Sequence, residues 1–221
     1  MKASFRIIFK PRVYTLYMEY RIKRGILISA TIILLVILYT FKNYSLALRI
    51  TAFLFSIYTL YAIDKLFNVR FKIIHYVLFL LVLTFSLLFS PMYFISEYYD
   101  KLLHLFLPII ISILVFFMIN RLKIEFRWKI LMTFTTLITL LTLFEIGEFA
   151  LDKLFDLKLQ GVYLRDISGI AKYNILMDKN DDTMIDLILG IIGSFSFCVF
   201  KYAERYYTRR KFKELYSPSR K

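Results

Sequence analysis

Three carboxylates stand close together near the end of a long apolar stretch: Glu145, Glu148 and Asp152. Their spacing places them on one face of a helix, because residues three, four or seven positions apart line up along a helix. The apolar stretch that carries them is long enough to cross a membrane. Acidic side chains within a membrane are costly, so they indicate a functional site with partners elsewhere in the chain.

Two other apolar segments begin with polar residues of matching chemistry. Asp100 precedes His104 by one helical turn, and Asp182 precedes Asp186 in the same way, so each pair projects from one helix face. We expect the three polar faces to turn toward one another, since that arrangement keeps the carboxylates away from lipid. Carboxylates that pack together repel one another unless protons or cations neutralise them.

Carboxylate oxygens together with one imidazole are suitable ligands for a divalent cation such as Mg²⁺, Mn²⁺ or Zn²⁺. The sequence therefore predicts a divalent-metal site with the ligands His104, Glu145, Glu148, Asp182 and Asp186. In a catalytic site, His104, Glu145, Glu148 and Asp186 would serve as metal ligands or as the general acid and base.

These acids have possible roles other than metal binding. Arg49 and Lys101 would hold a substrate phosphate in an enzyme, or they would be counter-ions in structural salt bridges with the acids. Asp100 and Asp182 are also candidates for helix N-caps, because each stands at the start of an apolar segment. Both alternatives stay open at the level of the sequence.

The composition is that of a membrane protein. Of the 221 residues, 59% are hydrophobic and 19% aromatic, and the mean hydropathy of +0.64 exceeds that of soluble domains. The formal net charge is +14, but the basic residues stand at the ends of apolar stretches. This placement indicates contacts with anionic headgroups at the cytoplasmic face and not with nucleic acid. The single cysteine, Cys198, excludes a disulfide within the chain.

The hydropathy pattern predicts an all-α, polytopic membrane helical bundle that forms a single domain over residues 1–221. Six transmembrane helices are expected at about 25–41, 46–67, 72–90, 101–119, 128–151 and 182–202. A basic segment (1–24), an outer loop (152–181) and a basic tail (203–221) complete the chain. The distribution of lysine and arginine places both termini in the cytoplasm. All the acids of the predicted site then lie near the outer face of the membrane.

Three motifs stand at these polar positions: Tyr99-Asp100-Lys101-Leu102-Leu103-His104, Glu145-Ile146-Gly147-Glu148-Phe149 and Asp182-Thr183-Met184-Ile185-Asp186-Leu187. Together with Asp152, Gln160 and Gly193, they resemble the signature of the YjdF-like family of uncharacterised prokaryotic membrane proteins. A looser similarity links them to VanZ-like proteins. The chain departs from the family pattern at Leu105 and Pro108. The resemblance implies a multi-pass membrane fold and the same site positions, and it implies no particular reaction.

These features predict a multi-pass protein of the cell membrane with an outward-facing acidic and histidine site that binds a divalent cation. Such a site would support hydrolysis or group transfer on a lipid-linked or envelope substrate, as in a metal-dependent hydrolase or transferase. One alternative is a small ion- or proton-coupled transporter or cation-binding protein. Another is a non-catalytic structural protein whose acids are salt-bridged. Membrane lipids are the expected partners.

Overall fold

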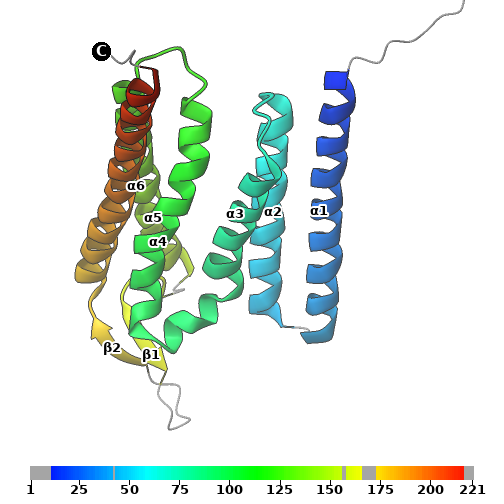
Figure 1. Ribbon diagram of the computed structural model, residues 1–221. Helices are drawn as coiled ribbons and strands as arrows, with labels where there is room; N and C mark the ends of the chain where they lie inside the picture. The colour runs from blue at the N-terminus through cyan, green and yellow to red at the C-terminus, as the bar shows by residue number, and fades with distance from the viewer. Residues whose placement is uncertain (1–10, 42, 156–157, 166–172, 217–221) are drawn as a thin grey trace, which may run out of the picture. The chain divides into compact units, whose positions relative to one another are not determined.

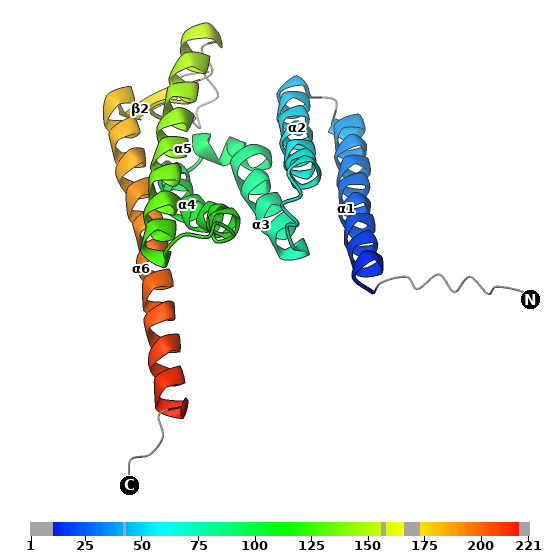
Figure 2. The same cartoon turned by 90° about the horizontal axis from the view of Figure 1, so that it is seen from above.

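The computed structural model describes residues 11–41, 43–155, 158–165 and 173–216. Within this part of the chain lie six α-helices and one short β-hairpin (Figures 1 and 2). Five of the helices are long and apolar enough to cross a membrane. The chain forms two compact units, Met1–Leu88 and Phe89–Lys221, and each is described by itself.

The first unit contains three α-helices, which are α1 (Pro11–Phe41), α2 (Tyr44–Leu66) and α3 (Ile73–Leu83). A π-helical turn, Thr84–Leu88, continues α3. The turn between α1 and α2 is closed by Asn43, whose side chain accepts a hydrogen bond from the amide of Leu46 at 3.1 Å. Such a cap satisfies one of the free amides at the start of a helix.

A buried ion pair joins α1 to α2 in this unit. Lys23 Nζ lies 2.7 Å from Asp64 Oδ2, and the two side chains are only 1% and 0% exposed. The hydroxyl of Tyr76 donates to the same oxygen at 3.0 Å, and the amide of Phe71 donates to Asp64 Oδ1 at 2.9 Å. Because both carboxylate oxygens have partners, Asp64 ties α1, α2 and α3 together.

The second unit is a three-helix bundle with a hairpin at one end. Its elements are a 3-10 turn (Ser90–Phe94), α4 (Glu97–Ile119), α5 (Phe126–Phe155), β1 (Val162–Arg165), β2 (Tyr173–Met177) and α6 (Lys179–Tyr216). The strands β1 and β2 are antiparallel. Figure 1 shows the hairpin at the end of the bundle where α4 and α6 begin and α5 ends. The predicted acids, His104 and Lys101 belong to this end.

Small residues on α6 allow the three helices of this bundle to approach closely. A Cβ atom on Gly193 would clash with the carbonyl oxygen of Leu105 in α4. A Cβ atom on Gly190 would lie 2.7 Å from the side chain of Leu141 in α5. The hydroxyl of the buried Ser194 donates to a carbonyl of its own helix at 2.8 Å. Small residues of this kind are typical of helix contacts within membranes.

The prediction of an all-α membrane protein is confirmed. The six spans, the single domain and the cytoplasmic location of both termini stay predictions. The third predicted span (72–90) is a shorter apolar helix, Ile73–Leu88. It has fewer residues than the roughly 20 that cross a hydrocarbon core without a tilt. Within the predicted outer loop (152–181), the described residues include the end of α5, which continues to Phe155, and the two strands of the β-hairpin.

Candidate functional site

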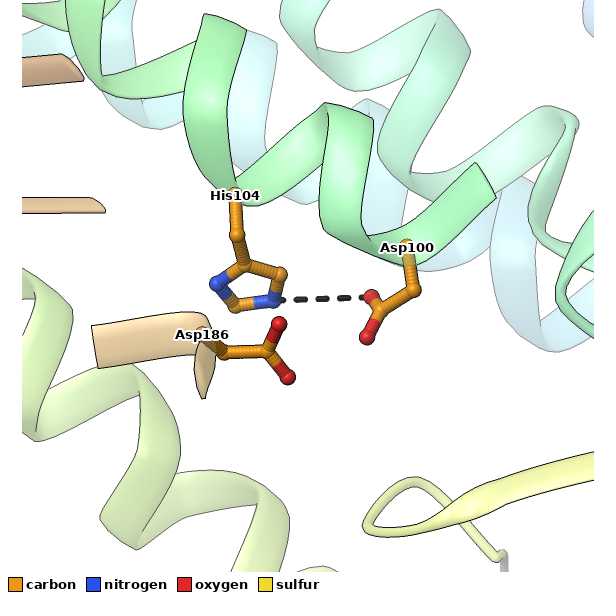
Figure 3. A group of neighbouring side chains, drawn as sticks. All are labelled: Asp100, His104 and Asp186. Atoms are coloured by element: carbon orange, nitrogen blue, oxygen red, sulfur yellow. Dashed lines mark ion pairs between the residues drawn. The ribbon is translucent and has the colours of Figure 1, made fainter. Parts of the chain in front are cut away.

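Polar side chains from α4, α5 and α6 meet at the hairpin end of the second unit. One ligand atom each of Asp100, His104 and Asp186 lies within 4.8 Å of the others (Figure 3). His104 and Asp186 are buried, and Asp100 is half-buried. Asp100 and His104 share a face of α4 because they are one turn apart. Asp186 reaches them from the beginning of α6.

His104 lies between two carboxylates. Its Nε2 is 3.5 Å from Asp100 Oδ1, and its Nδ1 is 3.6 Å from Glu145 Oε1 in α5. The ring of Phe144 packs against the imidazole with the ring centres 5.9 Å apart. A neutral imidazole nitrogen is a good metal ligand, so His104 is placed to share a cation with these carboxylates.

The carboxylate of Glu145 is buried, and it faces His104. Glu145 is only 4% exposed. Among the described residues, its Oε1 atom has no hydrogen-bond partner. A buried polar atom left without a partner costs about 1–3 kcal/mol. This oxygen is therefore suited to bind a cation or to carry a proton.

Lys101 supplies positive charge to the same site. Its Nζ lies 2.8 Å from each oxygen of Asp186 and 3.3 Å from Asp100 Oδ2. It also donates to Asp182 Oδ1, whose second oxygen accepts a hydrogen bond from the amide of Gly161 at 2.7 Å. The side chain of Lys101 is 14% exposed. Lys101 is therefore an ion-pair partner of three acids, and its predicted role toward a substrate phosphate or as a structural counter-ion stays a prediction.

Acidic groups outnumber basic groups in this cluster. Glu148 is half-buried, one turn after Glu145, and it lies within electrostatic range of both Glu145 and Asp100. Five carboxylates therefore share the site with one lysine and one histidine: Asp100, Glu145, Glu148, Asp182 and Asp186. We call this set, with Lys101 and His104, the acid/His cluster. Uncompensated negative charge in apolar surroundings requires protons or a cation.

Asp152 holds the hairpin end of the unit in place. Its Oδ1 accepts a hydrogen bond from the amide of Leu159 at 2.6 Å, and its Oδ2 accepts from the amide of Gln160 at 3.2 Å and from Lys179 Nζ at 2.8 Å. The side-chain amide of Gln160 in turn donates to Thr183 Oγ1 at 3.0 Å. Asp152, in α5, therefore holds Leu159, Gln160 and the beginning of α6 together.

Tyr93, which was not predicted from the sequence, lies beside the site. Burial, and then the negative charges of Asp100 and Glu148, raise the pKa of its hydroxyl far above the ordinary value. Its ring packs edge-on against Tyr99 at 5.2 Å. The hydroxyl therefore stays neutral at physiological pH and is available as a hydrogen-bond donor. One tyrosine among 17 carries no signal by itself.

Neither Asp100 nor Asp182 occupies the N-cap position of its helix. Ser96 occupies the N-cap position of α4, so Asp100 lies within the first turn of the helix. Asp182 likewise lies inside α6, which begins at Lys179. The carboxylate of Asp178 accepts hydrogen bonds from the amides of Asn180 and Asp181 in the first turn of α6, both at 2.9 Å. The N-cap interpretation is therefore wrong for both acids, whose side chains contact Lys101 instead.

Arg49 lies in α2 of the first unit, where its Nε donates to the carbonyl of Ser45 at 3.2 Å. Its predicted role as a phosphate ligand or counter-ion stays a prediction. Asp100, which the sequence did not include among the metal ligands, belongs to the closest group of possible ligand atoms. The sequence feature that could have identified Asp100 as a possible ligand is its position one helical turn before His104.

The residues at the centre of the cluster fit a divalent cation chemically. Asp100, His104 and Asp186 offer two carboxylates and one imidazole, a donor set that suits Zn²⁺ or Mn²⁺ and leaves coordination positions for water. Lys101 occupies one side of the Asp186 carboxylate. A carboxylate has about four lone-pair sites, so Asp186 can contact an ammonium group and a cation together.

Comparison with known proteins places the chain in a family. The family model described as "Predicted membrane protein (DUF2238)" matches residues 22–206, a range that includes the whole acid/His cluster. No curated protein and no solved structure matches the chain. The similarity to YjdF-like and VanZ-like proteins stays a resemblance. Because the match covers most of the sequence, the chain belongs to the DUF2238 family of membrane proteins.

Proposed function

We propose that this protein binds one divalent cation in the acid/His cluster and uses it to activate water. The observation that carries the proposal is the convergence of Asp100, His104 and Asp186 from two helices, with ligand atoms within 4.8 Å of one another. The buried Oε1 of Glu145, which has no hydrogen-bond partner among the described residues, supports it. A cation would neutralise the excess of carboxylates that one lysine leaves uncompensated.

Each residue of the cluster has a role in this proposal. Asp100, His104 and Asp186 hold the cation, and Glu145 is positioned to add a further oxygen. Glu148, half-buried and one turn away, acts as the general base. Lys101 orients Asp186 and contacts an anionic oxygen of the substrate. The cation, when bound, lowers the pKa of a water molecule and polarises the substrate.

The substrate that we propose is a lipid-linked or envelope phosphate ester, on which the protein performs hydrolysis or group transfer. The site lies near the ends of three helices that are long and apolar enough to cross a membrane, so lipid headgroups would reach it. The positive charge of Lys101 favours an anionic group. The predicted orientation places this end of the bundle on the outer side of the membrane.

This activity can be tested with purified protein reconstituted into vesicles that contain a lipid-linked diphosphate. We expect phosphate release that depends on Mn²⁺, Mg²⁺ or Zn²⁺ and stops in EDTA. Glu148→Gln should reduce release by about 10²–10⁴-fold, the range for loss of a general base. Asp181→Asn is the matched control, because Asp181 is an exposed acid at the start of α6. Release that is absent with every cation, or unaffected by Glu148→Gln, would contradict the proposal.

A second candidate is supported by the contacts of Lys101. This lysine reaches three carboxylates, as the structural salt-bridge alternative requires. In that case the acids would be neutralised by Lys101 and by protons, and the cluster would join α4 to α6 without catalysis. Such a protein would bind no divalent cation, which separates the two candidates experimentally.

A further inference from the structure

A basic pocket lies at the other end of the second unit. It has a volume of about 360 Å³ and is open to the surroundings. It lies between the beginning of α5 and the distal half of α6, and its walls include Phe126, Arg127, Tyr202, Arg205, Tyr206 and Arg209. We call it the arginine pocket. It shares no residue with the acid/His cluster.

Arg205 packs against an aromatic ring in this pocket. Its guanidinium group stacks on the ring of Phe126 at 4.1 Å from the ring centre, and Tyr202 packs beside Phe126 with the ring centres 6.3 Å apart. Stacking leaves the N–H groups at the edge of the guanidinium available, and these groups match the geometry of a phosphate. Within the part of the chain that the structure describes, Arg205 and Arg209 have no ion-pair or hydrogen-bond partner.

The third arginine has a weak partner. Arg127 pairs with Glu125 at 2.7 Å, but the two side chains are 71% and 67% exposed. Ion pairs with this exposure contribute little, so Arg127 can exchange its partner. Three arginines and one glutamate line the pocket. The excess positive charge is complementary to an anion.

The position of the pocket along α6 indicates where this anion comes from. Nineteen residues separate Asp186 from Arg205, which corresponds to about 28 Å of α-helix. This length is close to the thickness of a hydrocarbon core, about 30 Å. The arginine pocket therefore lies at the membrane surface opposite to the acid/His cluster. Tyr202 and Tyr206 in its walls are typical of the headgroup region.

We propose that the arginine pocket binds the phosphate group of an anionic phospholipid. Arg205 and Arg209 donate hydrogen bonds to the phosphate oxygens, and Phe126 keeps Arg205 in place. The tyrosine rings contact the glycerol and the first part of the acyl chains. This inference is independent of the proposed catalytic function, because the two sites lie at opposite ends of the bundle.

The test uses the purified, delipidated full-length chain in detergent. Native mass spectrometry measures the binding of phosphatidylglycerol and of phosphatidylcholine with the same acyl chains. We expect phosphatidylglycerol to bind the wild type at least about tenfold more tightly, since basic groups at the membrane surface attract anionic lipids. The double variant Arg205→Gln/Arg209→Gln should lose this preference. The matched control Lys123→Gln/Lys211→Gln removes equal charge from exposed residues at the same end and should keep it.

Two further measurements distinguish the pocket from general attraction. Phe126→Leu keeps every charge but removes the ring under Arg205, and it should weaken the binding of phosphatidylglycerol several-fold. Inorganic phosphate at millimolar concentration should not displace the lipid. Equal binding of the two lipids, an equal loss in the lysine control, or displacement by inorganic phosphate would each overturn the proposal. Circular dichroism verifies that the compared variants are folded.

Discussion

Lys101 is the residue on which the charge balance of the acid/His cluster depends. Its ammonium group is almost buried and contacts Asp100, Asp182 and Asp186. Attraction between opposite charges is strong in surroundings of low dielectric constant. Removal of one partner leaves the others as uncompensated buried charges, which is more damaging than the loss of an exposed ion pair.

We predict that Lys101→Met lowers the free energy of unfolding by about 3–5 kcal/mol, the range for a broken buried ion pair. Chemical denaturation in detergent measures this loss. Added Mn²⁺ should restore part of it, because a bound cation replaces the missing positive charge. Lys153→Met, at an exposed position on α5, should have little effect. A Lys101→Met protein as stable as the wild type would contradict the central position of this lysine.

Helical spacing in the sequence predicted which acids share a helix face. The pairs Asp100/His104 and Asp182/Asp186 each project from one face, and the structure brings Asp100, His104 and Asp186 together. Spacing did not predict that Lys101 contacts three acids, because its long, flexible stem brings its charge around the helix. Tyr93 was also missed, since it belongs to a separate short segment.

The acid/His cluster depends on the distance between α4 and α6. Asp100 and His104 come from α4, and Asp186 comes from α6. The helices approach closely at Gly193, where the carbonyl oxygen of Leu105 occupies the space that a Cβ atom would need. A backbone contact of this kind cannot be relieved by a change of rotamer. Substitution of the glycine must therefore move one helix.

We predict that Gly193→Ala destabilises the second unit by about 1–3 kcal/mol, as overpacked sites do, and weakens cation binding. Gly147→Ala on α5 is the matched control, because a Cβ atom there has no atom within 4 Å. An alanine within a helix is favoured over glycine by about 0.5–1 kcal/mol, so this control should be neutral or stabilising. Equal stability of the two variants would show that α4 and α6 do not depend on Gly193.

In the first unit, the Lys23–Asp64 pair has the corresponding structural role. We predict that Asp64→Ala lowers the free energy of unfolding by about 3–5 kcal/mol, because Lys23 would be left buried without its counter-ion. The amide of Phe71 and the hydroxyl of Tyr76 would also lose their acceptor. Lys65→Ala, at the adjacent exposed position, should change stability by less than about 0.5 kcal/mol. Similar results for both substitutions would argue against this role.

The sequence predicted long apolar helices well and short elements poorly. The strands Val162–Arg165 and Tyr173–Met177 are too short to show a periodic pattern. Their position depends on contacts that are distant in the sequence, such as the one between Gly161 and Asp182. The third apolar segment was predicted by hydropathy, but hydropathy does not determine how many of its residues are helical.

The distribution of basic residues along the chain predicts its orientation in the membrane. We expect a cysteine at Lys158 to react with an impermeant maleimide in intact cells. A cysteine at Lys123 should react only after the cells are permeabilised, because basic loops are retained in the cytoplasm. The background Cys198→Ser removes the only native cysteine. The reverse labelling pattern would place the acid/His cluster at the cytoplasmic face.

The family match extends over both units of the chain, but the proposed chemistry belongs to the second unit alone. There, the acid/His cluster and the arginine pocket lie at opposite ends of one three-helix bundle. A membrane protein with this arrangement can act on a substrate at one face while an anionic lipid binds at the other. The proposed function therefore depends first on whether the cluster binds a cation.

Elemental analysis of the purified protein, after equilibration with Mn²⁺ or Zn²⁺ and removal of free metal, measures whether the acid/His cluster binds a cation. We predict about one divalent cation per wild-type chain and at least about tenfold weaker binding in His104→Ala and Asp186→Asn, as for the loss of a ligand or its support. Asp181→Asn should bind like the wild type. Equally little metal in the wild type and in the cluster variants would contradict the account and favour salt bridges alone.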